Sequence, residues 1–287
     1  MSGEGAKRPS ISIVGPGRLG TALAINLNRA GWKIEQIIVR NGSAGSRQPG
    51  QLARKVGATV VELGRLRLAS RLVWIAVPDD AIAAVARGLA ESQSWRGMTV
   101  FHSSGTLTSD ALQPLRERGA TVASVHPGMT FVAKSTPALK GVPFGIEGDA
   151  PALRLARRVI AGVGGTAVPI RKENKVLYHA FDAFASPLLI ALMATLEEVG
   201  MAAGIPQAKL RTMAGPLLRQ TLENYLKHGA AAAFSGPFVR GDVGVIRGHL
   251  ERLRDAPLAR ASYVALARVA VNRLPVKNRR ALEKSLR

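Results

Sequence analysis

A glycine-rich hexapeptide, Gly15-Pro16-Gly17-Arg18-Leu19-Gly20, has the spacing of a phosphate-binding loop. It follows the β-branched run Ser10–Val14 and precedes Thr21–Ala30, whose apolar residues have helical spacing. In this context the first glycine permits a tight turn, the second lets a pyrophosphate approach the backbone, and the third lets helix and strand pack closely. The amides at the helix N-terminus would face the phosphates. The loop predicts a dinucleotide site; the alternative is a turn without a ligand.

The residues after the second predicted strand, Ile34–Val39, indicate which dinucleotide would bind. NAD-selective sites usually carry an acidic residue about 20 positions after the loop, which bonds the ribose 2′-hydroxyl. This chain has Arg40 and Asn41 there, with Ser43 close behind. A guanidinium can chelate a 2′-phosphate that a carboxylate would repel. We therefore expect NADP(H) rather than NAD(H), unless Arg40 is simply a surface arginine.

A third strand end should lie beside the same ligand. The apolar run Leu72–Val77 ends at Pro78 and is followed by two aspartates. Because ligands of open α/β sheets bind at the carboxyl ends of strands, we expect Val77 and Pro78 to contact the dinucleotide. A purely structural role for Pro78, as the end of the strand, is equally compatible with the sequence.

Polar side chains that could act on a substrate follow the next two predicted strands. Ser104 comes after Thr99–His102, and His126 comes after Thr121–Val125. Both could hold or protonate a polar substrate near the nicotinamide. His102, which lies within the strand, is expected to be a buried core histidine.

The second half of the chain offers further candidates. Lys175 and His179 are four residues apart and share one helix face, where either could donate a proton; a solvated face with a capping histidine is the alternative. Arg240 and Asp242 could clamp a substrate carboxylate or could pin their own loop by an ion pair. The sequence does not decide between these two roles.

Alternating strands and helices predict an α/β fold, a doubly wound parallel sheet, up to about residue 170. Beyond Arg171 the pattern is helical only, in Glu173–Gly200, Gln207–His228 and Ala256–Arg273. We therefore predict a Rossmann-like NADP-binding domain at 9–170 and an all-helical domain at 171–287.

Composition excludes several other classes of protein. The chain of 287 residues has no cysteine, which excludes disulfides, iron–sulfur clusters and thiol nucleophiles, and a cytoplasmic location is the default expectation. No metal-binding, P-loop or serine-hydrolase motif is present, so no metal is predicted. The apolar run Ala183–Leu196 is judged too short to cross a membrane, and the N-terminus lacks the apolar core of a signal peptide.

The net charge of +21 favours a polyanionic partner only weakly. The arginines are spread along the chain, and no basic run alternates with aromatic residues. We therefore expect a basic solvated surface, with nucleic-acid binding an unfavoured alternative.

Six motifs together resemble a known family. They are GPGRLG, AVPDD, HSSG, SVHPGMTF, KVLYHAFDAFAS and SGPFVRGDVGVIRGHL, which extend from about Ile11 to Leu250. This order resembles bacterial Rossmann-like proteins with a helical domain of unknown function, DUF2520. Such proteins are similar to ketopantoate reductase, pyrroline-5-carboxylate reductase and 6-phosphogluconate dehydrogenase.

The resemblance implies an NADP-binding domain and a helical domain that forms a homodimer and bounds the active site. It also implies, by position, a catalytic role for Lys175. One departure is Ser186-Pro187, where the family pattern has Ser-Asn. We hypothesise an NADP(H)-dependent oxidoreductase acting on a C=O or C=N bond of a small carboxylate-bearing metabolite. A reaction like that of ketopantoate reductase is the most specific form of this hypothesis. Lys175, His126 or His179 would be the acid. The alternative is a non-enzymatic NADP(H) sensor or scaffold.

Overall fold

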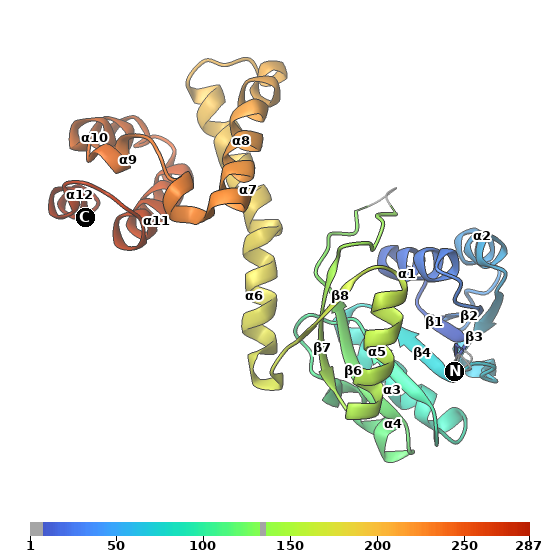
Figure 1. Ribbon diagram of the computed structural model, residues 1–287. Coiled ribbons are helices and arrows are strands. Elements are labelled where there is room, and N and C mark those ends of the chain that lie inside the picture. Colours follow the sequence, from blue (N-terminus) through green and yellow to red (C-terminus); the bar gives the residue numbers. More distant parts are fainter. Residues whose placement is uncertain (1–7, 133–135) are drawn as a thin grey trace, which may run out of the picture. The chain divides into compact units, whose positions relative to one another are not determined.

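The computed structural model describes residues 8–132 and 136–287. The chain forms two compact units, residues 1–183 and 184–287. The first unit contains an eight-stranded sheet with the strand order β3-β2-β1-β4-β5-β6-β7-β8 (Figure 1). The strands are β1 (Ile11–Val14), β2 (Ile34–Val39), β3 (Thr59–Glu62), β4 (Leu72–Ile75), β5 (Thr99–His102), β6 (Thr121–Pro127), β7 (Pro143–Gly148) and β8 (Thr166–Pro169).

Helices cover both faces of this sheet, as the sequence predicts for a Rossmann-like fold. They are α1 (Arg18–Arg29), α2 (Arg47–Val56), α3 (Asp79–Ser92), α4 (Gln113–Glu117) and α5 (Ala150–Gly162), with short 3₁₀ turns at Leu63–Arg65, Ser109–Leu112 and Lys172–Asn174. Alternate residues of a strand point to opposite faces, so Leu72 and Trp74 join one core while Val73 and Ile75 join the other. Burial on both faces explains why these strands are apolar throughout instead of alternating.

Two details of the sheet differ from the sequence prediction. The sheet is mainly parallel, as predicted, but the strand β7 pairs antiparallel with β6. The described residues that connect them, 128–132 and 136–142, contain no helix, and a parallel return would need such a crossover. The β6 strand also continues through His126 and Pro127, beyond the predicted end at Val125, because β7 supplies partners for both residues.

The helical half of the chain has more elements than the sequence pattern suggests. It contains α6 (Lys175–Ala185), α7 (Pro187–Ala202), α8 (Gln207–Ala233), α9 (Pro237–Arg240), α10 (Val243–Arg252), α11 (Pro257–Arg273) and α12 (Arg279–Ser285). The expected helix Glu173–Gly200 is interrupted at Ser186, because Pro187 starts a new helix at its first position. The α8 helix contains a non-helical residue, Gly229.

The α6 helix belongs to the first unit over most of its length, since that unit extends to residue 183. The sequence places the domain boundary earlier, near residue 171. Lys175, the first residue of α6, is 1% exposed and is hydrogen-bonded to the sheet domain. The second unit has a small core of its own, formed by Ile246, Leu250, Ala267, Val271, Leu282 and Leu286.

Among the described residues, the stretch Lys172–Ala202 is long and apolar enough, by length and composition alone, to cross a membrane. Its mean hydropathy reaches 1.6. This stretch is longer than Ala183–Leu196, the apolar run that the sequence indicates to be too short to cross a membrane. The expectation about a signal peptide concerns mainly residues 1–7, which lie outside the described residues.

Candidate functional site

The three glycines of the N-terminal loop have distinct structural roles. Gly15 has φ +88°, and a Cβ atom there would lie 2.7 Å from Cγ1 of Val77 and 2.8 Å from the carbonyl oxygen of Ala76. A Cβ atom on Gly20 would overlap the carbonyl oxygen of Gly15, so this glycine allows α1 to pack against the loop. A Cβ atom on Gly17 would meet nothing within 4 Å. The space over Gly17 is therefore open to a ligand.

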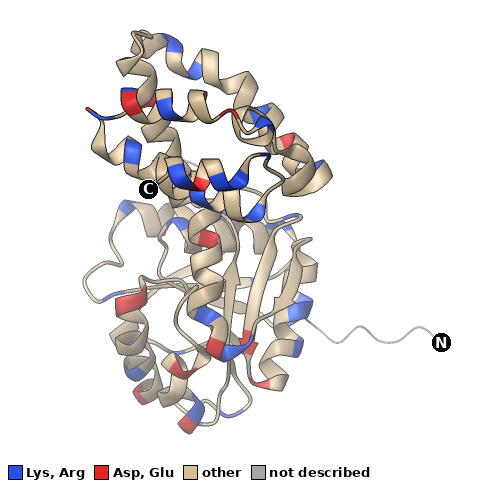
Figure 2. Cartoon of the chain, turned by 90° about the vertical axis from the view of Figure 1, so that its left-hand side faces the viewer, with Lys and Arg blue, Asp and Glu red and all other residues tan. Residues whose placement is uncertain are grey.

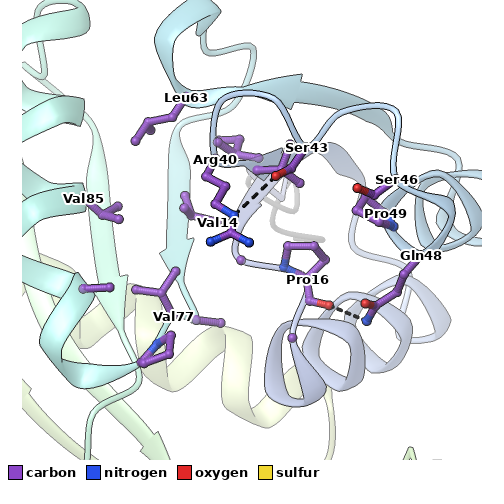
Figure 3. Close-up of a pocket in the computed structure, with 17 residues that line it drawn as sticks. Val14, Pro16, Arg40, Ser43, Ser46, Gln48, Pro49, Leu63, Val77 and Val85 are labelled. Atoms are coloured by element: carbon purple, nitrogen blue, oxygen red, sulfur yellow. Dashed lines mark hydrogen bonds between the residues drawn. The ribbon is translucent and has the colours of Figure 1, made fainter.

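A cavity of about 530 Å³ opens over this loop (Figure 3). Its walls come from the carboxyl ends of β1, β2 and β4 and from the start of α2. The lining includes Gly15, Pro16, Gly17, Arg40, Ser43, Ser46, Gln48, Leu63, Val77 and Pro78. The strands β1 and β4 are neighbours in the sheet but are not consecutive in the chain, which marks the point where dinucleotides bind in this fold.

Arg40 and Ser43 lie together on the rim of this cavity. Nε of Arg40 is 3.4 Å from Oγ of Ser43. Glu62 accepts hydrogen bonds from the backbone amides of Gly42 and Ala44, at 2.9 and 3.3 Å, and so shapes the loop that carries Ser43. The sequence pattern did not single out Gln48, whose Nε2 donates to the carbonyl of Pro16 at 2.8 Å and closes the cavity near the glycine loop.

Four predicted cofactor residues have no part in the cavity wall: Gly20, which packs α1 against the loop, and Asn41, Leu19 and Arg18. Asn41 accepts a hydrogen bond from the amide of Gly64 at 2.8 Å, which joins two loops. Leu19 packs against the core of the sheet domain. Arg18 is exposed at the start of α1.

A second set of polar residues lies farther along the same sheet edge, around the buried side chain of Lys175. The Nζ atom of Lys175 donates to Oγ of Ser124 at 2.8 Å and to the carbonyl oxygen of Ser104 at 3.0 Å. Burial lowers the pKa of Lys175 to about 8, against the attraction of Glu147, Asp79 and Asp182. At neutral pH this lysine can therefore both hold and release a proton.

Ser104 joins the lysine to the first residues of α3. Its hydroxyl donates to Asp79 at 2.6 Å and accepts from the amide of Leu107 at 2.8 Å. Asp79 also accepts from the hydroxyl of Thr106 at 2.9 Å. The hydroxyl of Ser104 is thus engaged in hydrogen bonds within the protein. The backbone carbonyl oxygen of Ser104 holds Lys175 in place.

His126 lies beside Tyr178 and Asp182, two residues of α6 that the sequence pattern did not single out. Nδ1 of His126 is 3.0 Å from the hydroxyl of Tyr178 and 3.5 Å from Oδ2 of Asp182. Burial, followed by repulsion from Lys175 and His179, lowers the pKa of His126 to about 4. Burial also raises the pKa values of Tyr178 and Asp182 above their usual ranges. The spacing Lys175, Tyr178, Asp182 on one helix face was a signal for both residues.

The remaining histidines of this region have different surroundings. His179 is exposed, and its ring lies against Gly105, where a Cβ atom would collide with it. His102 is fully buried, accepts from the amide of Ser104 at 3.1 Å and bonds the carbonyl of Thr108 at 3.0 Å. Both of its ring nitrogens are satisfied, which confirms the expectation of a core histidine.

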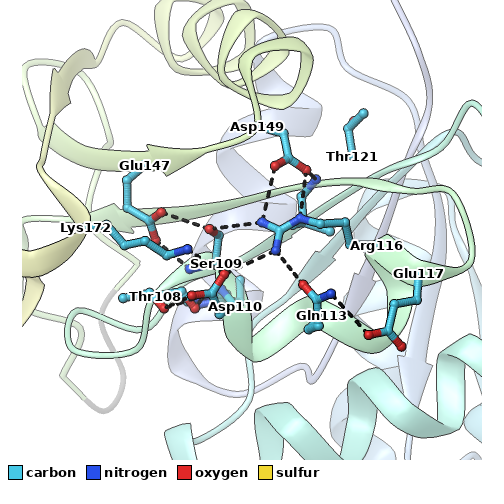
Figure 4. A network of polar contacts seen from close by, with 12 residues as sticks. Thr108, Ser109, Asp110, Gln113, Arg116, Glu117, Thr121, Glu147, Asp149 and Lys172 are labelled. Atoms are coloured by element: carbon cyan, nitrogen blue, oxygen red, sulfur yellow. Dashed lines mark hydrogen bonds and ion pairs between the residues drawn. The ribbon is translucent and has the colours of Figure 1, made fainter.

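A polar network anchors the segment that precedes α6 (Figure 4). The buried Glu147 accepts from the amide and the hydroxyl of Ser109, at 2.5 and 2.9 Å. Lys172 forms an ion pair with Asp110 at 2.5 Å, and Arg116 bridges Asp110 and Asp149 at 3.2 Å each. Because Lys172 lies three residues before Lys175, this network fixes where α6 begins.

In the second unit, Arg240 and Asp242 form an ion pair at 2.7 Å within their own loop. Of the two roles that the sequence left open, this ion pair corresponds to pinning the loop and not to clamping a substrate carboxylate. Among the described residues, no group of three or more potential ligands could hold a metal ion.

Two family models match the chain. A Rossmann-like domain matches residues 2–127, and the domain of unknown function DUF2520 matches residues 142–270. No curated protein matches the sequence significantly.

Solved structures share the fold of the whole chain at low sequence identity. A protein from Bacteroides fragilis, provisionally described as an NADP oxidoreductase, is 22% identical with TM-score 0.75, over 92% of this chain and 98% of that one. A reductive aminase from Aspergillus terreus in complex with NADPH is 16% identical with TM-score 0.67, over 98% and 100%. A pyrroline-5-carboxylate reductase from Coxiella burnetii is 15% identical with TM-score 0.59, over 98% and 97%.

Proposed function

We propose that this chain, a member of the family in which a Rossmann-like domain precedes a DUF2520 domain, is an NADP(H)-dependent oxidoreductase. The observation that carries the proposal is the position of two groups on one edge of the sheet. The Gly15–Gly20 loop follows β1, and the contacts of Lys175 and His126 are made at the ends of β5 and β6. Because β1, β4, β5 and β6 are parallel, all these ends lie at the same edge.

The residues of the cavity fit a dinucleotide that carries a 2′-phosphate. The open space over Gly17 and the N-terminus of α1 suit a pyrophosphate. Arg40 and Ser43, on the loop after β2, would hold the 2′-phosphate by charge-assisted hydrogen bonds. When bound, NADP(H) would supply or accept the hydride. One of the structures named above, the reductive aminase, is described in complex with NADPH, which supports the same cofactor.

Lys175 is the best candidate for the proton donor. Its ammonium has three N–H donors, and Ser104 and Ser124 take two of them. With a pKa of about 8, Lys175 is mostly protonated at neutral pH and can still transfer its proton to a developing alkoxide or amine. His126, with a pKa of about 4, is neutral at that pH, which makes it the weaker candidate for the acid.

The neutral His126 would instead orient the substrate. The Asp182 carboxylate 3.5 Å from Nδ1 favours a proton on that nitrogen, and the Tyr178 oxygen can accept it. Nε2 is then a hydrogen-bond acceptor, and it lies on the side of Gly105 and His179. Such an acceptor suits the N–H or O–H group of a substrate.

The substrate proposed here is a small carboxylate-bearing ketone or imine. Purified protein would be incubated with NADPH and a panel of 2-keto acids, ketopantoate and cyclic imines, and loss of nicotinamide absorbance would be followed. The matched variants are Lys175→Met and, as a control, Lys209→Met on α8. We expect turnover that Lys175→Met abolishes and Lys209→Met retains. Oxidation at the same rate in both variants would contradict the assignment of Lys175.

The second candidate function is that of a non-enzymatic NADP(H) sensor. This function is favoured because the hydroxyl of Ser104 is hydrogen-bonded to Asp79 and to the amide of Leu107, which leaves fewer polar groups near Lys175 to bind a substrate. Tight NADPH binding without oxidation across the panel would support it. Calorimetry that detects neither NADPH nor NADH binding would overturn both functions.

We further propose that the protein acts as a homodimer through α6 and α7. These helices expose large apolar side chains, among them Leu177 (72% exposed), Phe181 (68%) and Ile190 (67%). A membrane does not suit this surface, because Lys172 and Lys175 tie the start of the stretch to the sheet domain. A second copy of the chain would cover the surface and remove it from water.

A further inference from the structure

A second cavity of the sheet domain, of about 430 Å³, lies at the edge opposite the glycine loop. Its lining includes Pro9, which precedes β1, Arg71, which precedes β4, and Thr99, which begins β5. These three strands are parallel, so their amino ends share one edge. The cavity is therefore separate from the dinucleotide cavity, which opens at the carboxyl ends.

Arginine side chains from two elements meet at this cavity. Arg71 comes from the turn before β4, while Arg154 and Arg158 come from α5. Arg154 and Arg158 are four residues apart and so lie on one helix face, where like charges destabilise a helix. Arg71 adds a third positive charge to the same wall.

The carboxylates of this part of the domain have other partners. Asp149, just before α5, accepts from the amide of Val122 at 2.9 Å and pairs with Arg116. Glu35, at the edge strand β2, pairs with Lys33 at 2.6 Å. Arg71 and Arg154 form no ion pair or side-chain hydrogen bond with the described residues. The positive charge of these two guanidinium groups is thus available to a ligand.

The cavity is bounded by backbone and by neutral side chains apart from its arginines, which matches the chemistry of a phosphate ligand. Guanidinium groups bind phosphate oxygens in pairs of parallel hydrogen bonds, and several of them suit neighbouring phosphates better than a single one. The volume is that of a compact group. Lys and Arg residues are otherwise scattered over many helices, as Figure 2 shows, so a broad polyanion-binding surface is not apparent in that view.

We propose that Arg71 and Arg154 form a site for a small molecule that carries a diphosphate group. The ligand binds at the amino edge of the sheet, together with a dinucleotide at the carboxyl edge and without competition between the two. Free pyrophosphate and a nucleoside diphosphate offer the same chemistry. The site does not depend on the proposed oxidoreductase function.

Calorimetry with inorganic pyrophosphate at about 0.15 M salt tests the site, since surface charges are well screened there. The double variant Arg71→Gln/Arg154→Gln removes two charges from the cavity. The double variant Arg29→Gln/Arg157→Gln removes two exposed arginines elsewhere and serves as the control. We expect the first to weaken pyrophosphate binding about tenfold or more and the second by less than about twofold. Thermal unfolding of both variants checks that they fold.

Two further arms separate the alternatives. Gly17→Val should leave unchanged the pyrophosphate binding that Arg71→Gln/Arg154→Gln weakens, because Gly17 belongs to the other cavity. Loss of that binding in Gly17→Val would assign it to the glycine loop and overturn the proposal. ADP, AMP and phosphate distinguish a nucleotide from the free diphosphate, and ADP binding as strong as that of pyrophosphate supports a shared diphosphate site. Three other outcomes would overturn the proposal. They are equal pyrophosphate affinity in all variants, no pyrophosphate binding at all, and arginine-dependent binding of an oligonucleotide alone.

Discussion

The hydroxyl of Tyr178 lies 3.0 Å from Nδ1 of His126, and this contact joins α6 to the strand β6. We expect Tyr178→Phe to lower kcat about tenfold, because it removes one of the two groups that orient the imidazole of His126. We expect Asp182→Asn to lower kcat about 100-fold, because it removes the charge that selects the tautomer of His126. The dissociation constant for NADPH should change little in either variant.

Tyr225→Phe, on the exposed surface of α8, is the control for this pair. Steady-state kinetics and NADPH titration would be measured together. A loss of NADPH affinity without a loss of kcat would show that Tyr178 and Asp182 shape the fold and have no role in orienting His126.

The pH dependence of the reaction should report the protonation of Lys175. Burial lowers its pKa to about 8, and only the protonated form can donate. The rate of reduction should therefore be constant below about pH 7, fall through pH 8, and decline about tenfold for each further pH unit. The oxidation direction needs the neutral amine and should show the opposite slope. A flat profile between pH 7 and 10, measured with saturating substrate, would exclude Lys175 as the donor.

Arg40→Asp should change the choice of cofactor. It replaces a positive charge on the rim of the cavity by a negative one, which would repel a 2′-phosphate. We expect NADPH affinity to fall about 100-fold, with NADH affinity changed by less than about threefold. Arg157→Asp makes the same charge change on α5 and should affect neither cofactor. Equal losses for the two cofactors would show that Arg40 does not contact the 2′-phosphate.

Gly17 and Gly20 should separate binding from stability. Gly20→Ala places a methyl group against the carbonyl oxygen of Gly15 and should lower the free energy of unfolding by about 1–3 kcal/mol or more. Gly17→Ala meets nothing within 4 Å and should leave the unfolding temperature nearly unchanged while weakening NADPH binding. Denaturant unfolding and calorimetry test both; full NADPH affinity in Gly17→Ala would mean that the pyrophosphate does not approach this loop.

The apolar surface of α6 and α7 should be buried in a dimer. We expect sedimentation to give twice the mass of the chain, and Leu177→Arg/Phe181→Arg to give the monomer with an unchanged circular dichroism spectrum. Both side chains are exposed in the single chain, so the substitutions should not disturb its fold. A wild-type protein that remains monomeric at micromolar concentration would exclude the dimer.

Local sequence predicted the half of the candidate site that contains the glycine loop. The glycines, the strand before them and the helix after them are contiguous in the chain, so their spacing alone carries the geometry. The apolar strands likewise show their burial on both faces directly. The antiparallel direction of β7 was not predicted. The direction of a strand depends on its connection and on the available edge of the sheet, and a local sequence pattern does not encode either of them.

Only the tertiary structure decided the arrangement on the substrate side. Lys175 lies 71 residues from Ser104 and 51 from Ser124 in sequence, and Tyr178 lies 52 from His126. Their hydrogen bonds exist because α6 packs on the ends of β5 and β6, and the pKa values of Lys175 and His126 follow from the burial that this packing produces. Residue types and spacings name candidates for proton transfer, but desolvation and pairing across the chain decide which of them is protonated at neutral pH.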